Sequence, residues 1–395
     1  MSVTDKLKGK RILIWGYGRE GQSTRLFLKR CCEPAVIDVF EGAREDIDED
    51  AYDYIIKSPG IPMEDDHPKY TSQTELFLEE HSKRVIGITG TKGKSTTSSM
   101  IYHVLKETYP GKVILLGNIG EPCLNYFDEV DDNTIVVFEM SCHQLAHLSV
   151  SPHIAVFLNL YEEHLDYYKT FDRYFAAKRN ITNYQTEEDF FIVGEQVPEF
   201  ETKAQKIVMG RDNVPNYELK VLGEHNKYNA DVAVKIASEL IGVSKEAAIE
   251  ALKTFEGLAH RLQYIGTLDG VSYYDDSIST IPGATIQALE SVPGAKTVLV
   301  GGMDRGIDYE ELITYIRAHH EYNYICSYDS GKRIYDEVVD LDCCSYRENL
   351  EQAVAYAKEI TPSGMACILS PASASYGYFK NFEQRGEIFK ELVGV

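Results

Sequence analysis

The segment Gly87-Ile88-Thr89-Gly90-Thr91-Lys92-Gly93-Lys94-Ser95-Thr96-Thr97 decides how the rest of the chain is interpreted. An apolar stretch precedes it at residues 85–86, and a helix-like stretch follows at residues 98–105. A glycine loop between a strand and a helix lets backbone N–H groups reach phosphate oxygens, and the helix N-terminus adds favourable dipole charge. We therefore predict a phosphate-binding loop here rather than an ordinary glycine turn.

The polar residues of this loop are expected to bind phosphate and a metal ion. Lys94 can reach the terminal phosphates of a nucleotide, and Ser95 or Thr96 can ligate Mg²⁺. The general pattern of such loops needs a glycine five residues before Gly93, where this chain has Ile88. The segment is therefore a variant of the form T-G-T-x-G-K-S-T, which on its own indicates phosphate binding without naming the ligand.

The composition argues against several classes of protein. A length of 395 residues predicts two or three domains, and a hydrophobic content of 44% is enough for several cores. The formal net charge of −22 argues against a nucleic-acid or anionic-membrane partner. The eight cysteines form no CxxC framework, so we expect reduced, mostly buried thiols.

The sequence also carries expectations about location. Residues 1–10 are polar and lack the apolar core of a signal peptide. No run of about 18 apolar residues occurs, so no membrane span is expected. We expect a soluble cytoplasmic protein, and nothing in the sequence demands more than a monomer.

The first part of the chain predicts a small α/β unit. A strand is predicted at 11–15 and a helix at 22–29, with Gly16-Tyr17-Gly18-Arg19-Glu20-Gly21 between them. A second strand, at 35–37, ends at Asp38. A G-x-G-x-x-G loop followed about 20 residues later by an acidic residue is the fingerprint of dinucleotide-binding folds, in which the acid binds a ribose. The pattern indicates a nucleotide-like ligand, and a tight turn without a ligand is the alternative.

Strand and helix patterns continue through the chain. A third strand is predicted at 53–56, before Ser58-Pro59-Gly60, a loop that is typical of a ligand-lining edge. In the central section, continuous apolar runs between helical segments indicate a parallel sheet that is covered on both faces. Helices are predicted at 231–240 and 245–253, and Asp269-Gly270 predicts a hairpin turn. The further predicted strands lie at residues 113–116, 134–138, 154–158, 190–193, 206–209, 262–268, 271–274, 297–300, 324–326 and 366–369.

Polar residues gather where the central strands are predicted to end, which is where ligands bind open α/β sheets. Asn118, Glu139 and Asn159 each come at the end of a predicted strand, and His164 follows closely. A carboxylate at such a strand end, facing a phosphate loop, can hold Mg²⁺. Read singly, Glu139 could be a helix-capping charge, His164 an ordinary histidine and Lys178 a solvated helix residue.

Motifs occur in a fixed order over essentially the whole chain. They lie at residues 90–97, 117–120, 139–145, 159–166, 176–178, 223–230, 257–261, 276–277, 301–302, 369–375 and 379–386. This ordered set resembles the Mur ligase family. The resemblance implies an α/β fold of three domains. They would be an N-terminal Rossmann-like UDP-binding domain at 1–83, a central P-loop-type ATPase domain with a mostly parallel sheet at 84–258, and a C-terminal Rossmann-like domain for amino acid and ATP at 259–395.

Within the family the motifs are most similar to those of members that add glutamate to UDP-N-acetylmuramoyl-L-alanine. The resemblance implies a ligase of peptidoglycan precursor synthesis that uses ATP and Mg²⁺, and hence a role in cell-wall biogenesis, cell shape and cell division. The substrate carboxylate would attack the γ-phosphate of ATP, and the amine of glutamate would then attack the acyl phosphate. D-glutamate is the favoured acceptor and L-glutamate the alternative. A non-ligating nucleotide-dependent binding protein is less favoured, and the G-x-G-x-x-G unit argues against a folylpolyglutamate-type ligase.

The resemblance also assigns roles to residues. It implies catalytic roles for Lys94, His164 and Lys178, with Lys178 carbamylated. The expected metal-binding residues are Ser95, Glu139, His164 and Lys178. The expected ATP contacts are Gly90, Thr91, Gly93, Lys94, Ser95, Thr96, Asn229, Arg261 and Asp276. The expected contacts of the UDP-sugar are Gly16, Tyr17, Gly18, Arg19, Asp38, Ser58, Gly60 and Asn118.

The expected glutamate pocket departs from the family pattern. Ile278 stands where the D-S-K-A-T-N segment has its lysine, and Arg305 stands where G-G-x-x-K has its lysine. Arg305 could bind a carboxylate with two parallel hydrogen bonds, where lysine offers a point charge. Thr280, Ser375 and Phe382 remain as expected pocket contacts. The segment around Thr280, together with Arg305, also resembles a subgroup that adds L-glutamate.

Overall fold

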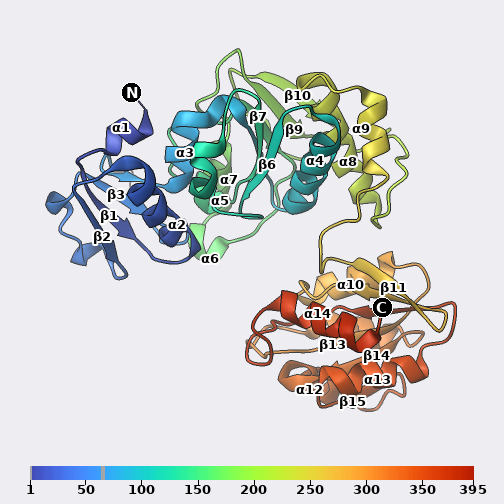
Figure 1. Ribbon diagram of the computed structural model, residues 1–395. Coiled ribbons are helices and arrows are strands. Elements are labelled where there is room, and N and C mark those ends of the chain that lie inside the picture. Colours follow the sequence, from blue (N-terminus) through green and yellow to red (C-terminus); the bar gives the residue numbers. More distant parts are fainter. Residues whose placement is uncertain (1, 64–66) are drawn as a thin grey trace. The chain divides into compact units, whose positions relative to one another are not determined.

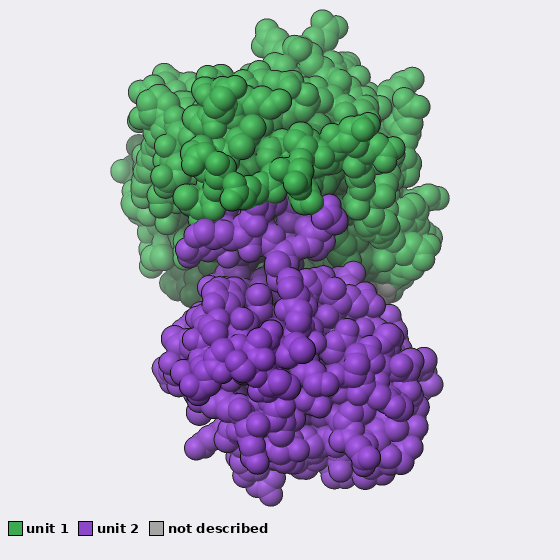
Figure 2. Space-filling view, turned by 90° about the vertical axis from the view of Figure 1, so that its right-hand side faces the viewer, with its two compact units in different colours: residues 1–218, 227–254 green, residues 219–226, 255–395 purple. Residues whose placement is uncertain are grey.

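Two compact units make up the protein, and the computed structural model describes residues 2–63 and 67–395. Unit 1 comprises Met1–Glu218 and Lys227–Thr254, and unit 2 comprises Leu219–Asn226 and Phe255–Val395 (Figure 2). The strands form three sheets, two in unit 1 and one in unit 2, with helices packed around them (Figure 1). The α/β fold class is therefore confirmed, whereas the domain limits after residues 83 and 258 stay predictions.

The first sheet of unit 1 has four parallel strands in the order β2-β1-β3-β4. They are β1 (Arg11–Trp15), β2 (Val36–Phe40), β3 (Tyr54–Lys57) and β4 (Tyr70–Thr71). Its helices are α1 (Val3–Leu7), α2 (Arg19–Phe27) and α3 (Gln73–His81), with a π-helical turn η1 (Leu28–Cys32) and the short turns η2 (Arg44–Asp46), η3 (Glu49–Ala51) and η4 (Ser82–Arg84). Trp15, the single tryptophan of the chain, is buried, and its indole N–H donates to the carbonyl of Gly42 at 3.0 Å.

The second sheet of unit 1 has six parallel strands in the order β10-β9-β8-β5-β7-β6. They are β5 (Val85–Thr89), β6 (Lys112–Gly117), β7 (Thr134–Glu139), β8 (Ile154–Phe157), β9 (Phe190–Gly194) and β10 (Gln205–Met209). Its helices are α4 (Lys94–Thr108), α5 (Cys142–Leu145), α6 (Leu165–Tyr168), α7 (Phe171–Arg179), α8 (Glu224–Lys235) and α9 (Lys245–Leu252), with turns η5 (Cys123–Glu129) and η6 (Ile236–Leu240). Every residue of β5 and β7 is buried, as expected for strands covered on both faces.

The sheet of unit 2 has six strands in the order β11-β12-β16-β13-β14-β15. They are β11 (Gln263–Leu268), β12 (Val271–Asp275), β13 (Ala295–Val300), β14 (Asn323–Ser327), β15 (Cys344–Arg347) and β16 (Ala366–Leu369). Its helices are α10 (Pro282–Ser291), α11 (Glu310–Ala318), α12 (Tyr328–Glu337), α13 (Leu350–Ile360) and α14 (Phe382–Val393). Asp269 and Gly270 both have positive φ and close the antiparallel β11–β12 hairpin, which confirms the predicted turn.

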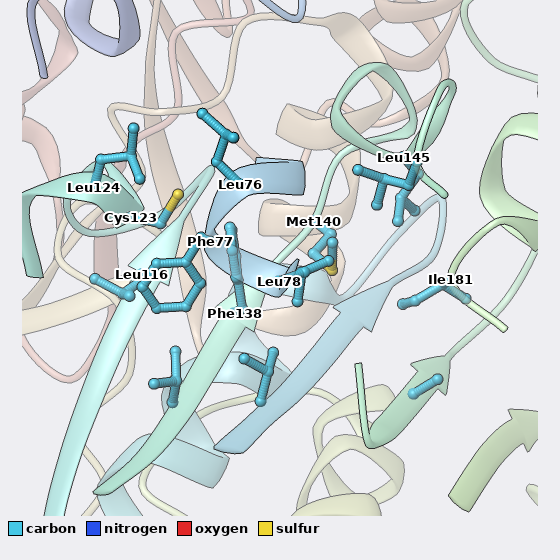
Figure 3. Packing of buried hydrophobic residues seen from close by; sticks show 14 of the residues in the cluster. Leu76, Phe77, Leu78, Leu116, Cys123, Leu124, Phe138, Met140, Leu145 and Ile181 are labelled. Atoms are coloured by element: carbon cyan, nitrogen blue, oxygen red, sulfur yellow. The ribbon is translucent and has the colours of Figure 1, made fainter. Parts of the chain in front are cut away.

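One hydrophobic core joins the two sheets of unit 1. Leu76, Phe77 and Leu78 of α3 are fully buried in the same cluster as Leu116 of β6 and Phe138 of β7 (Figure 3). The rings of Phe77 and Phe138 meet edge to face, with centroids 5.8 Å apart. The helix that follows the first sheet therefore packs on the second one, which fixes the two sheets against each other.

The strand predicted to end at Asp38 runs further than expected. β2 continues to Phe40, and Asp38 pairs with Leu13 rather than lying at the strand's carboxyl end. The prediction was wrong because β2 is an edge strand, where a polar side chain faces solvent without ending the strand. The carboxylate of Asp38 accepts a hydrogen bond from the Tyr52 hydroxyl at 2.9 Å.

The remaining general expectations can also be compared with the structure. All eight cysteines lie in the described residues as free thiols, and only Cys31 and Cys343 among them are partly exposed, which confirms the prediction. In the ranges 2–63 and 67–395, no helix combines the length and the apolar character that crossing a membrane requires.

Candidate active site

The phosphate loop lies where the sequence predicts it, between β5 and α4. Gly93 caps α4 with a φ of 84°, a left-handed conformation that favours glycine. A Cβ placed on Gly93 would lie 3.2 Å from Oδ1 of Asn229 in α8. The structure therefore brings the expected ATP residues of the loop together with Asn229, and leaves little room for any side chain at residue 93.

Asn159, at the end of β8, holds the loop in shape. Its Oδ1 accepts from the N–H of Lys92 and its Nδ2 donates to the carbonyl of Lys92, both at 2.9 Å. The backbone carbonyl of Asn159 accepts from the N–H of Thr91 at 3.1 Å. The Thr91 hydroxyl lies 3.1 Å from the Tyr174 hydroxyl and accepts from the N–H of Tyr161 at 3.0 Å. The loop is thus preorganised by the neighbouring strand before any ligand binds.

Two lysines converge on one carbonyl of the loop. Nζ of Lys94 donates to the carbonyl of Gly90 at 2.9 Å, and Nζ of Lys178 donates to the same oxygen at 2.8 Å. Lys178 is 1% exposed, and burial together with the charge of Lys94 lowers its pKa to about 7. Burial also lowers the pKa of Lys94. A substantial share of Lys178 is therefore an uncharged amine at neutral pH.

Glu139 ends β7 as a fully buried carboxylate. Its Oε1 accepts from Nδ2 of Asn118 at 2.8 Å, whereas its Oε2 has no hydrogen-bond partner in the described part of the chain. A buried carboxylate oxygen without a donor is costly, and a cation would satisfy it. The negative charge of Glu139 partly offsets the lowering of the pKa of Lys94 and Lys178 by burial.

These residues fit a magnesium ion by their chemistry. Carboxylate and hydroxyl oxygens are ligands that Mg²⁺ accepts, and it usually retains water and substrate phosphate oxygens as well. Among the described residues, no three His, Cys, Asp or Glu side chains are grouped so as to hold a metal by themselves. Glu139 would therefore hold the ion with the hydroxyl of Ser95, at the start of α4, and with phosphate oxygens.

His164 lies at the rim of this group. Its backbone is left-handed, with a φ of 56°, and its ring centroid is 6.1 Å from that of Tyr174. Its Nε2 is 4.0 Å from Oε2 of Glu163, whose Oε1 binds Nζ of Lys92 at 2.7 Å. The structure therefore places His164 beside the phosphate loop, with an exposed ring.

Part of the expected UDP-sugar set is also assembled in unit 1. The Ser58 hydroxyl donates to the carbonyl of Gly16 at 3.1 Å, and a Cβ on Gly16 would lie 2.7 Å from Ser58 Oγ. Arg19 donates to the carbonyl of Gly120 at 2.8 Å, in the loop that contains Asn118. Tyr17 and Gly18 belong to the same turn as Gly16, and Gly60 is exposed in the loop after Ser58. Asp38 is set back from this edge, as its pairing with Leu13 shows.

In unit 2, Asp276 is buried and strongly hydrogen-bonded. Its carboxylate accepts from the hydroxyls of Ser279 at 2.5 Å and Ser370 at 2.8 Å, and from the N–H of Leu262 at 3.0 Å. Burial raises its pKa to about 6. Arg261, the other expected ATP contact of this unit, is exposed.

The expected glutamate residues share one edge of the unit 2 sheet. Thr280 follows β12, Arg305 follows β13 and Ser375 follows β16, and these three strands are neighbours. Phe382 begins α14, with its ring centroid 6.1 Å from that of His260. Ser375 is buried, Thr280 and Phe382 are partly exposed, and Arg305 is exposed.

Comparison with known proteins agrees with this arrangement. The family model of the Mur ligase middle domain matches residues 88–210. Along 98% of its length the chain is 34% identical to the UDP-N-acetylmuramoylalanine–D-glutamate ligase of Aquifex aeolicus, and the match covers 99% of that protein. The chain belongs to the Mur ligase family.

This Mur ligase is also similar to a second curated relative in sequence and to a solved structure in fold. It is 31% identical, over 100% of its own length and 99% of the relative, to the UDP-N-acetylmuramoyl-L-alanine–L-glutamate ligase of Salinispora tropica. Its fold is similar to that of the MurF ligase from Thermotoga maritima in complex with ADP, with a TM-score of 0.60, 17% identity and coverage of 99% of this chain and 96% of that one. The family resemblance inferred from the motifs is therefore confirmed.

Two ionisable residues of this Mur ligase, Lys57, which is buried, and Glu20, which is partly buried, are not predicted by its sequence patterns. Lys57 donates to the carbonyls of Ser58 at 3.2 Å and Ile61 at 2.8 Å, and burial lowers its pKa to about 8. Glu20 accepts from Nε2 of Gln144 at 3.0 Å, and burial raises its pKa. Glu20 stands at a variable position of G-x-G-x-x-G, and Lys57 ends an apolar strand. A lysine that terminates an otherwise apolar strand is the one signal in the sequence that could have found it.

Proposed function

We propose that this Mur ligase adds D-glutamate to UDP-N-acetylmuramoyl-L-alanine, using ATP and Mg²⁺, as a cytoplasmic monomer without nucleic-acid or membrane partners. One observation supports it most. Lys94, Lys178 and the unpaired oxygen of Glu139 surround one phosphate loop in a chain whose relatives over full length are glutamate ligases. The product would be a precursor of peptidoglycan.

The chemistry requires the substrate carboxylate to acquire a better leaving group. A carboxylate oxygen of the alanyl group would attack the γ-phosphorus of ATP and release ADP, which leaves an acyl phosphate. The amine of glutamate would then attack the acyl carbon, losing a proton as phosphate departs. Lys94 would stabilise the negative charge spread over the transferring phosphoryl group. Bound Mg²⁺ would neutralise further charge on the phosphates.

We propose that Lys178 acts as a carbamate. An uncharged amine is the form that adds CO₂, and the addition releases one proton. The pKa of about 7 and the contact with the Gly90 carbonyl support this role. The carbamate would replace a buried cation by an anion beside Lys94, and would help to position the metal with Glu139 and His164.

Transfer of L-glutamate remains the second candidate, and two observations favour it. The relative from Salinispora tropica is named for L-glutamate, and Ser279 and Thr280 together with Arg305 resemble a subgroup that adds L-glutamate. A change of enantiomer needs relocated carboxylate contacts, which these residues could supply.

Arg305→Ala is expected to raise KM for glutamate more than KM for ATP, as steady-state kinetics would measure. The reverse ranking would remove Arg305 from the pocket.

The decisive experiment measures phosphate release from ATP with and without each substrate. The proposal expects release only when UDP-N-acetylmuramoyl-L-alanine and glutamate are both present, with D-glutamate the better acceptor. A preference for L-glutamate would replace the first candidate by the second. Release that ignores glutamate would contradict both and would favour a nucleotide-dependent binding protein.

A further inference from the structure

A buried arginine underlies the expected amino-acid pocket in unit 2. Arg385 of α14 is 1% exposed and is among the largest fully buried side chains of the described residues. Its nearest contacts come from loops that follow β12 and β16. Those loops also contain Thr280 and Ser375, so the arginine lies beneath residues already expected to bind glutamate.

The guanidinium of Arg385 joins two of these loops directly. Its Nε donates to the hydroxyl of Ser277 at 2.9 Å, and its Nη2 donates to the carbonyl of Ser277 at 2.6 Å. The same Nη2 donates to the carbonyl of Ser373 at 3.1 Å. The Ser277 hydroxyl in turn donates to the carbonyl of Phe382 at 2.8 Å. One planar group therefore sets the spacing of the two loops and of the start of α14.

A third loop packs closely against the same group. A Cβ placed on Gly302, after β13, would lie 3.0 Å from Nη1 of Arg385 and 2.4 Å from the carbonyl of Ala374. The hydroxyl of Ser330 accepts from the N–H of Gly302 at 2.8 Å and lies 2.8 Å from the Ser373 hydroxyl. The glycine thus allows the loop after β13 to approach the guanidinium.

Stability alone does not account for this arrangement. Taking a guanidinium out of water is costly, and Nη1 of Arg385 has no partner among residues 2–63 and 67–395. The carboxylate that favours its charge, Asp275, is already 2.6 Å from Nδ1 of His260. An apolar side chain of similar size would avoid the cost of the buried charge. What the arginine adds is a fixed geometry between loops.

We propose that Arg385 is a positioning residue for the incoming amino acid. It holds the Ser277 and Ser373 segments at one separation, and thereby sets the places of Thr280, Ser375 and Phe382. This inference rests on the proposed function, because it assigns these loops to the acceptor. Lysine could not replace the arginine, since a single ammonium cannot span both atoms of Ser277 and the carbonyl of Ser373 in one plane.

The test compares Arg385→Lys and Ser277→Ala with Thr361→Val. Thr361 is buried in the same unit, between α13 and β16, and its hydroxyl donates at 2.8 Å to that of Thr297 in the amino-terminal half of β13, so its loss destabilises unit 2 away from the loops. Arg385→Lys is expected to raise KM for glutamate about tenfold, with KM for ATP and for the UDP-sugar changed less than about twofold. Ser277→Ala is expected to give a smaller rise, because the backbone carbonyl remains.

A second measurement separates this inference from the proposed function. Hydrogen exchange of backbone amides at 275–280 and 371–376 is expected to accelerate about tenfold more in Arg385→Lys than in Thr361→Val, in which only the opening of unit 2 as a whole becomes easier. Equal rises in all three KM values, or unchanged exchange in both Arg385→Lys and Ser277→Ala, would overturn the role.

A wild-type protein without glutamate-dependent phosphate release would overturn the proposed function instead, and the exchange rates would still decide what Arg385 holds together. If Arg385→Lys does not fold, the KM values and exchange rates of Ser277→Ala decide between the same two outcomes.

Discussion

Lys178 shows how burial and a neighbouring charge together shift the pKa of one side chain. Its ammonium would face Lys94 across a single carbonyl, and burial with this charge lowers its pKa to about 7, which increases the share of uncharged amine. Lys178→Ala is expected to reduce ligation by at least about 100-fold, because the site loses an anion that positions the metal. Phosphate release assays would measure the loss. Added bicarbonate should not restore activity, whereas short carboxylates should restore part of it.

The same lysine predicts a dependence on pH and CO₂. Because its pKa is about 7, acidification below that value protonates the amine and leaves less of it able to add CO₂. Activity at limiting CO₂ should therefore fall below pH 7 and be recovered by added bicarbonate in the wild type. Lys112 is an exposed lysine that pairs with Glu129. The variant Lys112→Ala serves as the matched control and should behave as wild type. Full activity in Lys178→Ala would rule out the carbamate.

Lys57 predicts a second pH effect, at the UDP-sugar end. Burial lowers its pKa from 10.5 to about 8, so the ammonium that donates to the loop after β3 predominates below pH 8 and gives way to an uncharged amine, a weaker donor, as the pH rises through that value. KM for the UDP-sugar should therefore increase between about pH 8 and 10. Lys57→Met should show a raised KM at pH 7, by about tenfold, without further increase. Lys10→Met, at the partly exposed lysine directly before β1, is the control, and an unchanged pH profile in Lys57→Met would contradict the prediction.

At the scale of elements, strand–loop–helix geometry rather than any one side chain makes the phosphate site. Gly93 begins α4 in a left-handed conformation and lies against Asn229, so Gly93→Ala combines backbone strain with crowding. We expect a stability loss of about 1 kcal/mol and a large rise in KM for ATP. Gly242 has a similar φ of 85°, but there is open space around it. Gly242→Ala should therefore show the same loss of stability without a change in KM for ATP. Denaturant unfolding and steady-state kinetics would show whether the two effects separate.

How much of the fold can be predicted from the sequence differs from one helix or strand to another. The buried strands were recognisable because their apolar runs are continuous, as in β5 and β7. β4 has two residues and β15 reads Cys-Ser-Tyr-Arg, so neither has such a run, and neither was predicted. The sequence pattern ends β2 at Asp38, two residues before the strand ends in the structure. Lys94 and Glu139 lie in recognisable motifs and stay predicted site residues, whereas the sequence assigns no role to Lys57 or Arg385, because the contacts that single them out are visible only in the structure.

At the scale of the whole molecule, the two compact units predict that unfolding is not a single transition. Calorimetry should show two overlapping heat-absorption peaks. Thr361→Val removes buried hydrogen bonds in unit 2, so it should lower the midpoint of one peak by a few degrees and leave the other in place. A single peak that shifts as a whole would contradict the expectation.

Trp15 is the only tryptophan, so the tryptophan fluorescence of this protein reports on one part of its fold. Because the ring is buried in β1, directly before the turn at Gly16, its emission senses only the first sheet and whatever binds at that turn. A red shift on heating would mark the melting of unit 1 and so assign the two calorimetric peaks. Quenching on addition of a UDP-sugar would follow substrate capture without a label, in a protein whose other chromophores are tyrosines and phenylalanines.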